Sequence, residues 1–202
     1  MELLIFLALT GGGMYFKALE QRQRIALLGQ HLGQFEIEKL MESLMQGYQR
    51  ALGEESIERQ RQVWAHFASQ EEKLSAQFAE FAKAFSGVWA DNALVSTLPI
   101  ALPRADKLFP AATFDVRKAF QIHADGLHAA VRNTPEQCDK DRAYAITAEL
   151  MLMQHTCHWF CRSKTVASAR LLKQHKTRYE QVLAAVSAPT RQRYTALTIH
   201  KP

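Results

Sequence analysis

Between Trp64 and Phe85, large apolar side chains recur at alternating intervals of three and four residues. Intervals of three and four place side chains on one face of an α-helix, whereas a strand would need intervals of two. The pattern predicts a long helix whose apolar seam packs either inside this chain or against a second copy of it. The seam consists of Trp64, Phe67, Leu74, Phe78, Phe81 and Phe85, and Glu71 fills the remaining place in the series.

Helical periodicity also covers most of the remaining chain. A second amphipathic stretch runs over 35–52 and is closed by Gly53. Thr113 or Asp115 can begin another helix, and Thr134, Pro135 and Gln137 form a capping signal for the next one.

That next helix is apolar nearly all round over 144–161, which is typical of the centre of a bundle. A last helix carries inward-facing residues from Leu171 to Val186 and is expected to end at Ala188-Pro189. No alternating strand pattern stands out. The sequence therefore predicts an all-α fold, in which an N-terminal transmembrane or membrane-associated helix precedes a four- to five-helix bundle.

The expected organisation has five parts. Pro99, Pro103 and Pro110 interrupt any helix after Gly87, but the stretch around them is rich in Leu and Ile and predicts an ordered connection. The parts are an anchor (1–24), an amphipathic helical hairpin (25–86), the proline-containing connection (87–112), a bundle half with a basic last helix (113–188) and a basic tail (189–202).

The N-terminal run is the least polar part of the chain. No charged residue occurs between Leu3 and Phe16, and Lys17, Arg22 and Arg24 follow closely. A spanning helix needs about 20 apolar residues, which this run approaches only if Lys17 snorkels. A removed leader and a short amphipathic or buried helix are the alternatives. We expect a membrane anchor formed by Leu3, Leu4, Ile5, Phe6, Leu7, Leu9, Met14, Tyr15 and Phe16.

Charge and cysteine content indicate a compartment. The basic residues follow the apolar run, so the positive-inside rule places the N-terminus outside and the main domain in the cytoplasm. Three cysteines are a poor disulfide framework and suit a reducing compartment. The sequence therefore predicts a protein of the inner (cytoplasmic) membrane.

The C-terminal part of the chain is strongly basic. Residues 162–202 hold nine Lys or Arg and one acidic residue, whereas the whole chain has a formal charge of +5. Arg170, Lys173, Lys176 and Arg178 are expected to bind anionic lipid or an acidic protein face. A solvated face that binds nothing is the alternative. Nucleic acid is a less favoured partner, because no motif for reading nucleic acid is evident.

One cluster could ligate a metal. His155, Cys157, His158 and Cys161 lie within two helical turns, and His123 and His128 could complete a zinc or copper site from the preceding helix. Histidines and cysteines of a helix core are the alternative. A disulfide between Cys157 and Cys161 across one helical turn would fit poorly, which argues against a redox role.

Conventional catalytic signatures are missing, including phosphate-binding loops, a nucleophile elbow and a His-Glu-x-x-His motif. We therefore expect no enzymatic activity. The sequence favours a membrane-anchored helical interaction or scaffold protein whose partners are membrane lipid and another protein or a second copy. A metal- or haem-binding helical sensor and a soluble nucleic-acid-binding bundle remain as alternatives.

Overall fold

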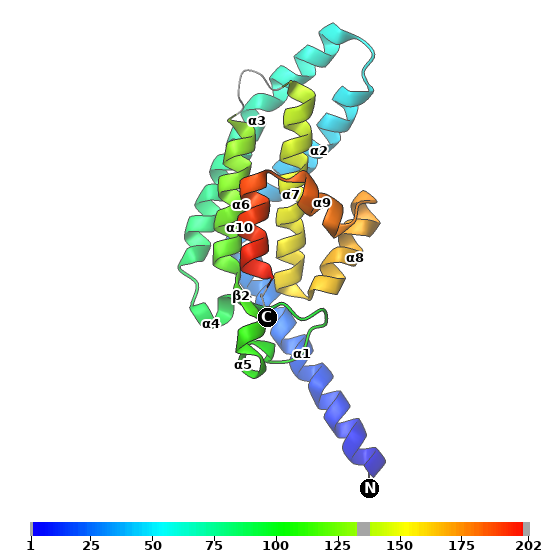
Figure 1. Cartoon of the computed structure of the whole chain (residues 1–202), viewed down its shortest axis with the longest axis vertical. Helices are drawn as coiled ribbons and strands as arrows, with labels where there is room; N and C mark the ends of the chain where they lie inside the picture. The colour runs from blue at the N-terminus through cyan, green and yellow to red at the C-terminus, as the bar shows by residue number, and fades with distance from the viewer. Residues whose placement is uncertain (1, 133–137, 200–202) are drawn as a thin grey trace.

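The computed structural model describes residues 2–132 and 138–199 and confirms the predicted all-α fold (Figure 1). The described part of the chain contains ten α-helices, one 3-10 helix and two short strands. The helices are α1 (Glu2–Leu32), α2 (Ile37–Gly53), α3 (Ile57–Ser86), α4 (Ala90–Ala93), α5 (Ala105–Leu108), α6 (Val116–Val131), α7 (Asp139–Cys161), α8 (Lys164–His175), α9 (Tyr179–Ala185) and α10 (Ala188–Thr198).

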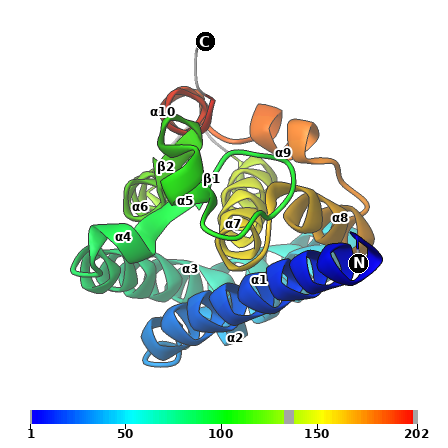
Figure 2. The ribbon, with the colours of Figure 1, turned by 90° about the horizontal axis from the view of Figure 1, so that it is seen from below.

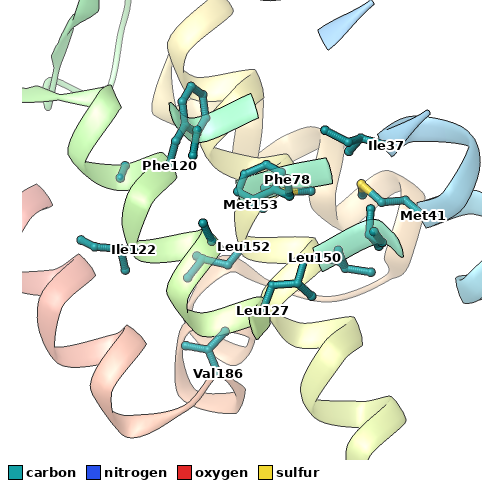
Figure 3. Close-up of a cluster of buried hydrophobic side chains, with 14 of the residues drawn as sticks. Ile37, Met41, Phe78, Phe120, Ile122, Leu127, Leu150, Leu152, Met153 and Val186 are labelled. Atoms are coloured by element: carbon teal, nitrogen blue, oxygen red, sulfur yellow. The ribbon is translucent and has the colours of Figure 1, made fainter. Parts of the chain in front are cut away.

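Helices α3, α6 and α7 form the centre of the bundle. Helix α2 pairs with α3, α10 lies on α6, and α8 and α9 lie on α7 (Figures 1 and 2). Helix α7 is covered on most of its circumference, which explains why its sequence is apolar nearly all round. Its Leu150, Leu152 and Met153 meet Phe78 of α3 and Phe120 of α6 in the cluster of Figure 3.

The aromatic seam of α3 lies inside this single chain. All six of its apolar residues are buried, and Phe78, Phe81 and Phe85 are fully covered. Phe120 of α6 stands edge-on to Phe81 and Phe85, with ring centroids 5.1 and 5.0 Å apart. Edge-to-face pairs of this kind add to the free energy of burial. The seam is therefore intramolecular core and is not exposed for self-association.

The connection after α3 is ordered, as expected, but it contains a small sheet that periodicity did not reveal. Strands β1 (Leu94–Ser96) and β2 (Thr113–Asp115) pair antiparallel, with Val95 opposite Phe114. The 3-10 helix Pro110–Ala112 leads into β2. Asp115 then caps α6 by accepting a hydrogen bond from the backbone N–H of Arg117 (2.9 Å), which confirms one of the two predicted helix starts.

The C-terminal third differs from the prediction of one helix and a tail. It forms three helices, because Lys176 adopts a left-handed conformation (φ 54°) that ends α8. Pro189 does not end a helix: it lies in the first turn of α10, where a missing backbone N–H costs nothing. Tyr194 of α10 is fully buried, so most of the expected basic tail belongs to the bundle.

The capping signal predicted at Thr134, Pro135 and Gln137 lies outside the described residues. Helix α7 itself begins at Asp139, with Cys138 in the capping position.

Candidate functional site

Helix α1 runs without interruption to Leu32, across the boundary between the expected anchor (1–24) and the expected hairpin (25–86). Its second half is docked on the bundle through Arg24, which donates hydrogen bonds to the carbonyl oxygens of Leu94 (3.1 Å) and Phe160 (3.3 Å). The same guanidinium pairs with Glu20 (2.8 Å) and lies over the Phe160 ring. Arg24 was expected to be part of an exposed basic flank, but it fastens α1 to the fold.

The first half of α1 projects from the bundle, as Figures 1 and 2 show. Met14, Tyr15 and Phe16 are 73%, 66% and 60% exposed. Within the described part of the chain, no helix combines the length and the apolarity needed to cross a membrane.

The end of the bundle from which α1 emerges carries further exposed apolar side chains. We call this end the basal face and define it by Trp89, Ile100, Leu102, Leu108 and Phe109. Trp89 is 82% exposed directly before α4, and Leu108 is 65% exposed at the end of α5. Sequence reasoning missed this face, because apolar residues of the connection were expected to lie against the bundle.

Two polar contacts and one shared cavity connect the parts of the basal face. Lys107 of α5 pairs with Asp91 of α4 (2.9 Å). Glu20 of α1 accepts a hydrogen bond from the backbone N–H of Arg104, directly before α5 (3.1 Å). A small cavity beside α1 is lined by Lys17, Ile100 and Leu102 together. The protruding helix and the loops of the basal face therefore meet at one place.

The four predicted lipid- or partner-binding cations lie elsewhere. Arg170, Lys173, Lys176 and Arg178 are exposed along α8 and the turn after it, on the flank of the bundle. Arg170 donates a hydrogen bond to Nδ1 of His158 (3.1 Å). The role predicted for these cations stays a prediction.

A groove with a volume of about 820 Å³ opens on the flank between α1, α2, α7 and α8. Its floor includes Leu28, Met41, Phe78 and Met153, and Met45 and Cys157 add soft, polarisable sulfur. The acidic side chains of the lining come from α2, and the basic ones come from α8 and the end of α7. The charged and polar lining includes Glu38, Glu42, Gln46, Gln154, His158, Arg162, Arg170 and His175.

Burial keeps the ionisable groups inside this groove neutral. Burial raises the pKa of the Cys157 thiol, and it raises that of Cys161 to about 11. Burial, assisted by the Arg170 charge, lowers the pKa of His158, and burial also lowers that of His175, which hydrogen-bonds Gln154 (2.9 Å). The groove thus combines a neutral interior with charged rims.

The four predicted metal ligands do not converge. Positions 155 and 157 lie about 200° apart around a helix at 100° per residue. Cys157, His158 and Cys161 line the groove, whereas His155 stacks on Tyr179 of α9 (4.5 Å) and contacts Ser168 of α8 (3.1 Å). Over residues 2–132 and 138–199, no group of three or more His, Cys, Asp or Glu is placed to hold a metal ion.

His123 and His128 do not complete such a site either. His128 is exposed, and His123 is buried in a chain of hydrogen bonds between α6, α7 and α10. Its Nε2 lies 2.8 Å from Oγ1 of Thr156, which lies 2.8 Å from the hydroxyl of Tyr194. Burial lowers the pKa of His123 to about 3, so this histidine is a neutral core residue.

A second buried polar cluster ties α2, α3 and α7 at the end opposite the basal face. Glu71, the charged member of the α3 seam, is 2% exposed. It accepts a hydrogen bond from the hydroxyl of Tyr48 (2.7 Å) and pairs with Arg142 (3.2 Å). Arg142 also pairs with Asp139 (3.0 Å), which brings its charge towards the surface. This cluster satisfies a buried carboxylate and forms part of the structural core.

Comparison of the chain with models of known protein families, with curated proteins and with solved structures found no match.

Proposed function

We propose that this chain is a helical interaction protein attached to a lipid bilayer by the first half of α1. The observation that carries the proposal is the projecting, uncharged stretch 3–16. Its described large side chains, Met14, Tyr15 and Phe16, are exposed to water, although burying each in an apolar medium would gain about 1.5–3 kcal/mol. The proposal assigns no reaction to the chain.

The length of the stretch favours insertion over crossing. Fourteen helical residues at 1.5 Å per residue extend about 21 Å, less than the ~30 Å hydrocarbon core of a bilayer. An apolar helix that enters one leaflet and a basic segment behind it form two attachment signals. Lys17 and Arg22 directly follow the apolar stretch.

We further propose that the bundle lies on the cytoplasmic side of the inner membrane. Anionic headgroups of the cytoplasmic leaflet would attract the basic segment. All three cysteines are free, which suits a reducing compartment.

The groove on the flank supports the interaction part of the proposal. Its volume is within the range of ligand pockets. An apolar floor lined by acidic side chains of α2 and basic side chains of α8 would complement an amphipathic helix of a partner protein that carries both charges.

Vesicle flotation tests the attachment. Full-length protein is mixed with phosphatidylglycerol-containing vesicles and compared with the Leu4→Glu/Leu7→Glu variant. A charged side chain within hydrocarbon costs about 2.5–3.5 kcal/mol, so two of them should reduce binding more than a hundredfold. The control is Leu52→Glu/Tyr144→Glu, which changes two exposed apolar residues of α2 and α7 far from α1.

We expect the wild-type protein and the control to float with the vesicles, and the α1 variant to remain at the bottom of the gradient. Wild-type protein that does not float, or an α1 variant that floats as well as the wild type, would refute the attachment.

A further inference from the structure

We infer that the basal face is itself a membrane-contacting surface, so that the protein meets the bilayer end-on through α1 and this face together. The inference rests on the proposed attachment of α1 and adds a second contact to it. Its occupant is the headgroup region of a bilayer.

The first argument is the position of Lys17. This residue is the first cation after the uncharged stretch, so a bilayer that holds α1 ends near it. Lys17 lines the same small cavity as Ile100 and Leu102. A bilayer whose surface lies at the level of Lys17 would therefore contact the basal face without any movement of the bundle.

The basal face combines an exposed tryptophan with other exposed large apolar side chains. Trp89 is exposed directly before α4, and Leu108 and Phe109 are exposed at the end of α5; an ion pair between the side chains of Lys107 and Asp91 connects the two short helices. A tryptophan with apolar neighbours and nearby cations is typical of side chains at the level of lipid headgroups. The basal face thus gathers five exposed large apolar side chains on neighbouring short segments.

The two ends of the bundle differ in the charged side chains that they expose. The turn between α2 and α3 lies at the opposite end and exposes Glu55, Glu58 and Arg59. At the basal end, Lys17, Arg22 and Arg104 form no ion pair among the described contacts, whereas Asp91 is neutralised by Lys107. Free cations at the basal end complement anionic lipid.

Trp89 provides a direct reporter. The chain has three tryptophans, and Trp64 and Trp159 are 5% and 1% exposed. The difference in emission between wild-type protein and Trp89→Phe, recorded with vesicles in excess, therefore isolates position 89. We expect vesicles to shift this emission to the blue, and bromine atoms near the headgroup end of the acyl chains to quench it.

A pair of variants measures the contribution of the face to binding. Leu108→Glu/Phe109→Glu should weaken the apparent affinity for phosphatidylglycerol vesicles at least about tenfold, because two apolar side chains lose a partly buried position. Leu52→Glu/Tyr144→Glu, with the same number of added charges at the other end, should bind like the wild type. Unchanged circular dichroism spectra establish that both variants are folded.

The outcomes separate the two proposals. If the wild-type protein floats but Trp89 is not quenched and Leu108→Glu/Phe109→Glu binds normally, the basal contact is refuted while the attachment by α1 stands. If the wild type does not float, both fall. If Trp89 emission shifts with protein concentration in the absence of vesicles, the face joins two copies of the chain, and the membrane contact is refuted.

Discussion

Acidification from pH 7 to pH 5 should destabilise this fold through two buried histidines. His123 and His155 are each 1% exposed, and burial lowers the pKa of both to about 3. For His155, the charge of Lys164 adds to the effect of burial within this value. In the unfolded chain both rings have a pKa near 6.5. Between these values the unfolded state binds more protons, so stability rises with pH across this window and is lost as pH falls.

The size of the effect follows from these values. Each histidine contributes about 1.4 kcal/mol per pH unit inside the window, hence about 2 kcal/mol between pH 6.5 and pH 5, and about 4 kcal/mol for the pair. Glu149 acts in the opposite direction, because burial raises its pKa and protonation then favours the folded state. It offsets part of the loss as the pH approaches its folded pKa.

Urea unfolding followed by circular dichroism at pH 7 and pH 5 measures the effect. His123→Gln and His155→Gln should each reduce the difference between the two pH values by about 2 kcal/mol, whatever their stability at pH 7. His128→Gln, at an exposed position of α6, is the control and should leave the difference unchanged. Equal stability of the wild type at both pH values, or buried-site variants that retain the full difference, would contradict the assignment of neutral core histidines.

Three further predictions concern packing, charge and thiol chemistry. Gly47→Ala should lower the stability by about 2 kcal/mol, because the added Cβ would lie 2.0 Å from the ring of Phe67 in α3. Gly29→Ala brings its Cβ near no other atom and should raise the stability by up to about 1 kcal/mol. Thermal unfolding distinguishes the two signs. Glu71→Gln should lower the stability by about 2 kcal/mol in urea unfolding, because it removes the buried carboxylate that accepts from Tyr48 and pairs with Arg142, which keeps only Asp139; Glu72→Gln, at the adjacent exposed position, should cost almost nothing. Of the three thiols, the exposed Cys138 should react first with a disulfide reagent at pH 8, and a faster reaction of either α7 thiol would contradict their raised pKa values.

The helices of the core could be predicted from sequence wherever the apolar periodicity extends over several turns. Helix α3 spans 30 residues, so its seam repeats often enough to exclude a strand. The two strands have three residues each, which is too short for any period to show. The break at Lys176 gave no signal either, because a left-handed conformation usually favours glycine. Pro189 is compatible with both the end and the beginning of a helix. The structure shows that a helix begins there, and the buried Tyr194 holds this helix on the bundle.

Of the candidate site, only the part formed by a continuous stretch of sequence could be predicted. The uncharged stretch 3–16 is visible in the sequence, whereas the basal face is not. Trp89, Leu108 and Phe109 are residue types that are usually buried, and their exposure depends on how two short segments around α4 and α5 pack. The His/Cys cluster failed as a site for a local reason, since His155 lies on the opposite side of α7 from Cys157.

The continuity of α1 links the proposed lipid contact to the groove. Ile25, Leu28 and Leu32 line the groove on the same helix that carries the apolar stretch outward. A bilayer that held the first half of α1 would pull on this helix. The two hydrogen bonds from Arg24 to carbonyl oxygens and its ion pair with Glu20 would oppose a movement of α1 relative to the bundle. Tilting α1 against the bundle would require these contacts to break, and charge-assisted hydrogen bonds each contribute about 1.5–3 kcal/mol. Under the proposed attachment, the same contacts would set both the orientation of the bundle on the bilayer and the width of the groove, and weakening Arg24 should alter both together.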